Sequence, residues 1–185
     1  MSQHLRMATS GDGFPLDSYT VFVIGASGDL AKKKTYPSLY ELFVNGLLPA
    51  GRMTIVGYAR SDISDAKFRD TIRVHLPATG DATKLEAFLA LCCYRSGGYD
   101  DVAAFGRAVE FGASQEAVLS QTGKANRLFY LAIPPSVFTA AAATARASGL
   151  VGWWRSCVCV SLFRAATLVC VPRIADVNWL EPRRR

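Results

Sequence analysis

The sequence has few of the residues that build metal centres or disulfide scaffolds. Its 185 residues include only two histidines, and its five cysteines form no Cys-x-x-Cys pair. A zinc site is therefore not expected, because such sites need clustered Cys and His ligands. An odd cysteine count without a secretory signal favours reduced thiols and a cytoplasmic setting. The cysteines are Cys92, Cys93, Cys157, Cys159 and Cys170.

Long hydrophobic runs are also missing. No stretch approaches the ~20 apolar residues that a membrane helix needs, and residues 1–17 lack the apolar segment of a secretory signal. We therefore predict no membrane partner. Half of the residues are hydrophobic and 19% are charged, which is typical of a globular domain rather than a disordered chain.

A strong basic surface is not evident outside one end of the chain. The formal net charge is +6, but residues 151–185 alone hold six arginines against Asp176 and Glu181. The rest of the chain is close to balanced, so we predict no nucleic-acid partner. Binding of nucleic acid through the arginine-rich tail remains a minor alternative that rests on charge alone.

The stretch that organises the chain is 20–35. The β-branched run from Val21 to Ile24 predicts a buried strand, and helical spacing of apolar residues begins at Leu30. A strand, a glycine turn and a helix in this order make a phosphate site, because the first N–H groups and the positive dipole end of the helix face the anion. The stretch therefore predicts a dinucleotide-binding turn.

The spacing within this turn is Gly-x-x-Gly-x-x-Ala, a variant of the dinucleotide fingerprint that lacks its middle glycine. Gly25 allows a tight turn, Gly28 lets the backbone approach a diphosphate, and Ala31 lets the helix pack on the strand. The competing interpretation is a P-loop, whose pattern is Gly-x-x-x-x-Gly-Lys-Ser/Thr. Lys33 stands where that pattern requires its second glycine, which disfavours the P-loop.

Strand and helix patterns alternate along the rest of the chain. Strands are expected at 53–56 and 127–133, and helices at 61–76, 85–92, 102–121 and 136–147. This alternation predicts an α/β fold with a Rossmann-like, doubly wound parallel sheet, incomplete in this chain. We divide the chain into a flexible leader at 1–18, a coenzyme domain at 19–152 and a divergent tail at 153–185. Within that tail, 157–163 and 167–171 could form strands.

The helix after the glycine turn carries an apolar face that should cover the sheet. Pro37 lies inside this pattern and should kink the helix or split off its first turn, because proline has no N–H and clashes with the preceding turn. Asn45-Gly46 should stop the helix. The predicted face is Tyr36, Leu39, Tyr40, Phe43 and Leu47.

An arginine at the end of the second strand predicts the choice of cofactor. Dinucleotide folds usually place an acidic residue there to hold the ribose hydroxyls, whereas an arginine accommodates the 2′-phosphate of NADP. Here the strand ends in Ala59-Arg60. A guanidinium can grip a phosphate through paired hydrogen bonds. Arg60 therefore favours NADP, against the plainer interpretation of an exposed arginine.

Several motifs together resemble glucose-6-phosphate dehydrogenase. The most specific is Gly-Ala-Ser-Gly-Asp-Leu-Ala-Lys-Lys-Lys at 25–34. Asn-Gly-Leu-Leu-Pro at 45–49, Ile-Val-Gly-Tyr-Ala-Arg at 55–60 and Asn-Arg-Leu-Phe-Tyr-Leu-Ala-Ile-Pro-Pro at 126–135 follow in order. Gly-Gly-Tyr-Asp-Asp at 97–101 agrees more weakly. The resemblance covers about 20–150 and ends near Trp153.

The resemblance implies an NADP-dependent oxidoreductase of glucose metabolism. Members of the family oxidise glucose 6-phosphate to 6-phosphogluconolactone in the first step of the pentose phosphate pathway, and they are homo-oligomers. The resemblance also assigns coenzyme contacts to Lys32, Lys34 and Tyr130, although a strand tyrosine is more often core. The expected cofactor-binding residues are Gly25, Ala26, Ser27, Gly28, Asp29, Leu30, Ala31, Lys32, Lys34, Arg60 and Tyr130.

Two family motifs do not occur in the sequence. The catalytic histidine of the family lies in Arg-Ile-Asp-His-Tyr-Leu-Gly-Lys, and a lysine near the substrate lies in Glu-Lys-Pro-Phe-Gly. We therefore assign no catalytic residue and expect glucose 6-phosphate to bind only where the missing domain is present. The changed composition after Trp153 suggests a shifted frame, a retained intron or a truncated gene model.

Two further interpretations bear on the function. A non-catalytic chain that binds NADP, or that joins full-length subunits, is the main alternative. A short-chain dehydrogenase or epimerase is disfavoured, because these enzymes need a Tyr-x-x-x-Lys pair and none of the seven tyrosines has a lysine four positions on.

Overall fold

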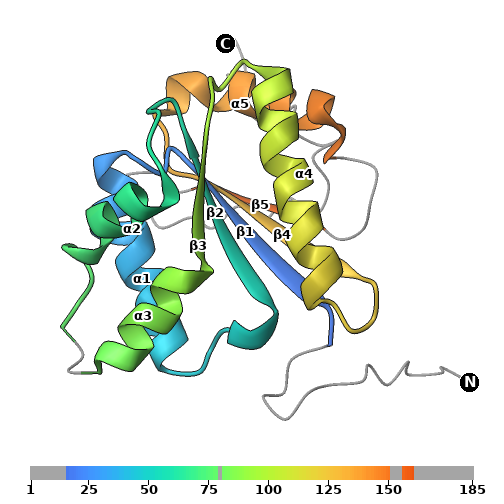
Figure 1. Cartoon of the computed structure of the whole chain (residues 1–185). Helices are drawn as coiled ribbons and strands as arrows, with labels where there is room; N and C mark the ends of the chain where they lie inside the picture. Colours follow the sequence, from blue (N-terminus) through green and yellow to red (C-terminus); the bar gives the residue numbers. More distant parts are fainter. Residues whose placement is uncertain (1–15, 79–80, 151–155, 161–185) are drawn as a thin grey trace, which may run out of the picture.

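In the part of the chain that the structure describes, five parallel strands form one sheet in the order β3-β2-β1-β4-β5 (Figure 1). The computed structural model describes residues 16–78, 81–150 and 156–160. This order is the doubly wound arrangement. The chain starts at the centre of the sheet with β1, adds β2 and β3 on one side, and then adds β4 and β5 on the other, so the strand order reverses between β1 and β4. The strands are β1 (Ser18–Ile24), β2 (Met53–Ala59), β3 (Cys92–Ser96), β4 (Ala125–Leu131) and β5 (Ser156–Val160).

Helices cover both faces of the sheet. In Figure 1, α1, α2 and α3 lie on one side of the strands, and α4 lies on the other with α5 near its upper end. Short helical segments flank some of them: η1 (Ala31–Thr35), η2 (Ala50–Arg52), η3 (Pro135–Val137) and η4 (Arg146–Leu150). The α-helices are α1 (Tyr36–Val44), α2 (Asp65–Arg73), α3 (Ala82–Leu91), α4 (Val102–Leu119) and α5 (Phe138–Ala145).

The side chains of the central strand, β1, contribute to two hydrophobic cores, one on each face of the sheet. Val21 and Val23 belong to the buried cluster on the face of α1, α2 and α3. Phe22 and Ile24 belong to the cluster on the face of α4 and α5, where the Phe22 ring stacks on Phe129 with centroids 4.7 Å apart. Because both faces are covered, β1 is a continuous apolar run rather than an alternating one.

The first helix begins with a wide π-helical turn, η1, which passes directly into α1. Pro37 sits at the start of α1, and its missing N–H explains why the regular ladder begins only there. The predicted irregularity is therefore confirmed. α1 ends at Val44 and Gly46 has a φ of +69°, as expected. Leu47 lies past that end and is 58% exposed, so its predicted place in the core is wrong.

The edge strand β3 was not predicted. The sequence Cys-Cys-Tyr-Arg-Ser lacks the apolar alternation of a strand, and Cys92 was expected at the end of a helix. The outer edge is instead stabilised by α2: the Tyr94 N–H donates to Asp65 Oδ1 at 2.7 Å, and Arg69 Nε donates to the Cys92 carbonyl at 2.8 Å. Side chains that occupy backbone groups in this way protect an edge strand.

The other edge of the described sheet is β5. It pairs in parallel with β4, with Arg127 opposite Ser156. It overlaps the first part of the strand expected at 157–163, whereas the strand expected at 167–171 lies outside the described residues. Most of the predicted leader lies outside them too, but its last residue, Ser18, is the buried first residue of β1, so the leader prediction is wrong there.

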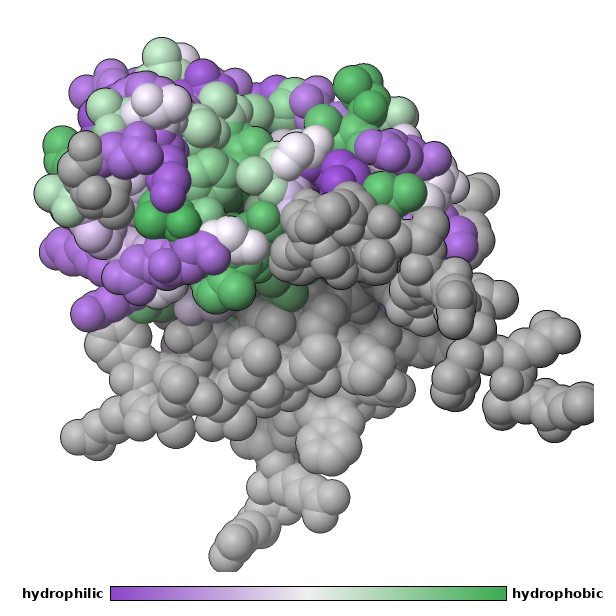
Figure 2. Space-filling view, turned by 90° about the horizontal axis from the view of Figure 1, so that it is seen from below, coloured by the Kyte–Doolittle hydropathy of each residue, from purple (hydrophilic) through white to green (hydrophobic). Residues whose placement is uncertain are grey.

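On the described part of the face seen from below, hydrophilic and hydrophobic residues are interspersed (Figure 2). Among the described helices, none has the length and apolar character needed to cross a bilayer.

Candidate functional site

The glycine turn after β1 is anchored to the neighbouring strand. The Gly25 and Ala26 N–H groups both donate to the Tyr58 carbonyl, at 2.7 and 3.2 Å, and the Gly28 N–H donates to the Gly25 carbonyl at 2.9 Å. Gly25 has a φ of +89°, which L side chains rarely adopt. The amides of Gly25 and Ala26 thus hold the turn against β2, and the amides that can face a ligand come later.

Those later amides lie at the start of the first helix. The Lys32 N–H donates to the Gly28 carbonyl at 3.1 Å. The amides of 29–31 therefore lie ahead of the helical hydrogen-bond ladder, where N–H groups have no intrahelical acceptor. Together with the positive end of the helix dipole, they make this edge suitable for an anion.

Lysines and one carboxylate surround this helix start. Asp29 accepts from Lys33 Nζ at 2.9 Å, and Lys32 Nζ lies 3.3 Å from its other oxygen. The hydrogen bonds from Lys33 and then Lys32 lower the pKa of Asp29. Lys34 is exposed. Two lysines beside free helical amides would favour a bound phosphate.

The small and apolar members of the motif face inward. Ala31 is fully buried, and Leu30 is half-buried against the cluster on the α1 face. Ala31 therefore lets the helix approach the sheet, which is the packing role expected for the third small residue of a dinucleotide motif.

Arg60 lies immediately after β2, exposed to solvent, at the same edge of the sheet as the turn. The Ser27 and Ser61 hydroxyls are 3.1 Å apart, so the glycine turn and the segment that carries Arg60 are in direct contact. The Arg60 guanidinium lies over Tyr99, 5.6 Å from the ring centroid. A cation and an aromatic face beside a phosphate-binding turn suit the adenosine end of a dinucleotide.

Tyr130 lies at the carboxyl end of β4, paired in register with Val23. It is half-buried and packs against the cluster on the α1 face. Tyr130 therefore contacts the core and also lies at the edge of the sheet where open α/β folds bind ligands.

The family model for the NAD binding domain of glucose-6-phosphate dehydrogenase matches residues 22–159. The chain belongs to the glucose-6-phosphate dehydrogenase family. Both the predicted resemblance and the predicted α/β fold class are confirmed, and the cofactor is confirmed as a nicotinamide dinucleotide of the NAD(P) type.

Curated relatives agree with this assignment. A Dictyostelium discoideum glucose-6-phosphate 1-dehydrogenase is 45% identical over 119 residues, which cover 64% of this chain and 23% of the relative. The cytoplasmic isoform 5 of Arabidopsis thaliana is 42% identical over 149 residues, covering 75% of this chain and 29% of the relative. Chloroplastic members also match. The chain thus spans less than a third of the length of these relatives.

A solved glucose-6-phosphate dehydrogenase in complex with glucose 6-phosphate has the same fold. It superposes with a TM-score of 0.69 at 30% identity, covering 78% of this chain and 30% of that chain. The enzyme from Mycobacterium avium superposes with a TM-score of 0.62 at 27% identity, over 77% and 29% of the two chains.

Two tyrosines of the site were missed by the sequence reasoning. Tyr99 contacts Arg60, and Tyr94 donates to the backbone on either side of it. The Gly-Gly-Tyr-Asp-Asp stretch at 97–101 could have indicated Tyr99, because it agrees, though weakly, with a motif of the family. Tyr94 had no signal, because the strand that carries it was not predicted.

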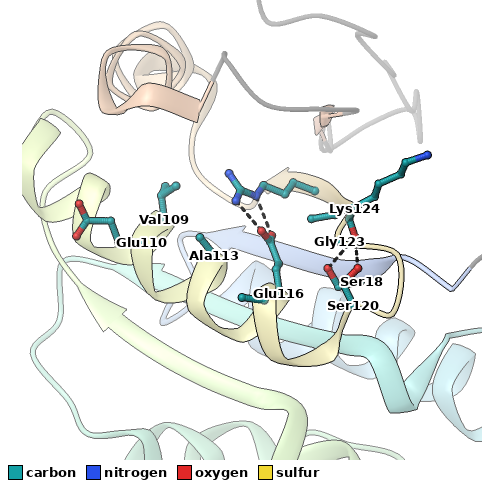
Figure 3. Close-up of a pocket in the computed structure, with 11 residues that line it drawn as sticks. Ser18, Val109, Glu110, Ala113, Glu116, Ser120, Gly123 and Lys124 are labelled. Atoms are coloured by element: carbon teal, nitrogen blue, oxygen red, sulfur yellow. Dashed lines mark hydrogen bonds and ion pairs between the residues drawn. The ribbon is translucent and has the colours of Figure 1, made fainter.

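A cavity of about 580 Å³ lies away from this site. It sits between α4 and the beginning of β4, at the amino edge of the sheet (Figure 3). Glu116 and Arg127 both lie in its lining and form an ion pair. The hollow therefore lies at the opposite edge of the sheet from the glycine turn and is separate from the candidate site.

Proposed function

We propose that this chain binds NADP at the carboxyl edge of β1 and β2. In the family reaction, the domain would serve the NADP-dependent oxidation of glucose 6-phosphate to 6-phosphogluconolactone. The observation that supports this best is the 3.1 Å contact between Ser27 and Ser61. It brings a phosphate-binding turn and a guanidinium to one place, which is what a phosphorylated dinucleotide requires.

Each part of the site has a role in this proposal. The amides of 29–31 face the diphosphate, with Lys32 and Lys34 adding positive charge. Arg60 holds the 2′-phosphate through charge-assisted hydrogen bonds, and Tyr99 offers an aromatic face beside it. A bound nicotinamide would supply the hydride acceptor of the family reaction. Tyr130, at the end of β4, lies along the same ligand edge.

The 185 residues hold neither the histidine motif nor the Glu-Lys-Pro-Phe-Gly motif. Proton abstraction needs a base within hydrogen-bond reach of the substrate, so we propose that this polypeptide alone does not turn over the substrate. We further propose that it binds the coenzyme through residues 19–152 and that it does so in the cytoplasm. The purified chain is expected to produce no NADPH absorbance from glucose 6-phosphate and NADP. Substantial turnover would show this part of the proposal to be wrong.

Replacing Arg60 with alanine tests the coenzyme role. The affinity for NADP should fall about 10- to 100-fold, the value of one or two charge-assisted hydrogen bonds, while the affinity for NAD should be unchanged. Calorimetric titration of both nucleotides measures the difference. Lys124→Ala removes one positive charge at the amino edge of the sheet and should leave both affinities unchanged. A preference for NADP that survives Arg60→Ala would refute the role of Arg60.

A further inference from the structure

A single buried hydroxyl holds the backbone on both sides of Arg60. Tyr94 Oη lies 2.6 Å from the Ser61 carbonyl and 3.2 Å from the Ala59 carbonyl. The one hydroxyl proton is shared between two acceptors, and the shorter contact, to Ser61, is the stronger. The two acceptors are the residues that flank Arg60 in the chain.

Tyr94 is itself a rigid anchor. It is 2% exposed, and its ring packs against Phe68 with centroids 5.0 Å apart. Its backbone N–H is bound by Asp65. The hydroxyl therefore has a fixed position, set by the core and by α2 rather than by the loop that it holds.

Arg60, by contrast, is exposed, so the direction of its side chain depends on its backbone as well as on the Tyr99 ring beneath its guanidinium. A binding group on a loop is precise only where neighbouring contacts fix that loop. Here the segment from Ala59 to Ser61 is held by Tyr94 from β3 and by the Ser27 hydroxyl of the glycine turn. The Gly97 N–H also donates to the Ala59 carbonyl, at 3.0 Å.

We propose that Tyr94 is a positioning residue for coenzyme selection: by fixing the segment from Ala59 to Ser61, it aims Arg60 at the 2′-phosphate of the adenosine ribose. Tyr94 acts through that segment and does not touch the ligand. The inference rests on the proposed function. It predicts that the Tyr94 hydroxyl contributes to discrimination between NADP and NAD, because only NADP uses the Arg60 guanidinium.

The test is the ratio of NADP to NAD affinity in the full chain and in Tyr94→Phe. Loss of the hydroxyl should lower this ratio about three- to ten-fold, the factor expected for one or two hydrogen bonds, and should leave NAD affinity close to that of the unchanged chain. The ratio compares two ligands on the same folded molecules, so a partial loss of stability does not alter it.

Tyr36→Phe is the matched control. Tyr36 is fully buried, its ring meets Phe68 edge-on at 5.4 Å, and its hydroxyl has no hydrogen-bond partner among the described residues. Removing that hydroxyl should leave the ratio unchanged. A ratio that falls equally in both variants would attribute the effect to core packing and overturn the proposal.

The remaining outcomes separate the inference from the function beneath it. If the unchanged chain shows no preference, or Arg60→Ala keeps it, the proposed function fails. If Arg60→Ala removes the preference but Tyr94→Phe retains it, or lowers both affinities equally, only the role of Tyr94 fails. Should Tyr94→Phe not fold, Ser61→Ala removes the contact with Ser27 at an exposed position and keeps the carbonyl that Tyr94 binds. It should lower the ratio about two-fold. An unchanged ratio would show that holding this segment does not aim Arg60, which would overturn the proposal.

Discussion

Replacement of Gly25 by alanine is expected to destabilise the chain by about 3 kcal/mol or more and to remove coenzyme binding. An added Cβ would lie 2.4 Å from the Ala132 carbonyl oxygen and 2.7 Å from Ile133 Cγ2. The φ of +89° adds about 1–2 kcal/mol for any L residue, and overpacking a filled site costs about 1–3 kcal/mol. Urea denaturation measures the first effect and NADP titration the second.

Gly46→Ala is the control for this prediction. Gly46 has a similar φ of +69°, but nothing lies within 4 Å of an added Cβ. Only the backbone conformation is penalised, so the loss should be about 1 kcal/mol, and coenzyme binding should persist. Equal losses in the two variants would contradict the close packing of the turn against the segment after β4.

Glu116→Ala should destabilise the fold by about 3–5 kcal/mol, because it leaves a buried guanidinium without its partner. The Glu116 and Arg127 side chains are 7% and 12% exposed, and Arg127 donates to both carboxylate oxygens, at 2.7 and 2.5 Å. Thr20 donates to the same carboxylate at 2.8 Å. The pair therefore joins α4 to β1 and β4, and equilibrium unfolding in urea measures its loss.

An exposed ion pair provides the comparison. Glu86 binds Arg73 between α3 and α2, with side chains that are 60% and 38% exposed. Surface pairs contribute about 0–1 kcal/mol, so Glu86→Ala should change the free energy of unfolding little. If Glu116→Ala were as mild as Glu86→Ala, the buried pair would not stabilise the junction of α4 with the sheet.

The central motif could be predicted from sequence because its determinants are local. The β-branched run, Gly25 and the apolar spacing from Leu30 lie within a few residues of one another, and the structure forms the strand, turn and helix there. Pro37 likewise acts on its own turn of helix. The error at Leu47 has a local cause too: the helical spacing was extended past Gly46, where the chain leaves the helix.

The parts that could not be predicted depend on contacts between distant segments. β3 is short and polar at its end, and it is a strand because α2 stabilises its outer edge. Tyr94 reaches Ser61 across 33 positions, and the Ser27 and Ser61 hydroxyls meet across 34. No spacing rule joins such pairs, so the support beneath Arg60 appears only in the folded chain.

The most direct test of the account is to follow backbone amide resonances while NADP is added to the labelled chain. The account predicts saturable shifts concentrated at Asp29, Leu30, Ala31 and Arg60, with Lys124 at the opposite edge unmoved. NAD should leave Arg60 unmoved. Saturable shifts confined to the cavity beside α4, or no shifts at the helix start, would contradict the central claim that the glycine turn and Arg60 together form the NADP site.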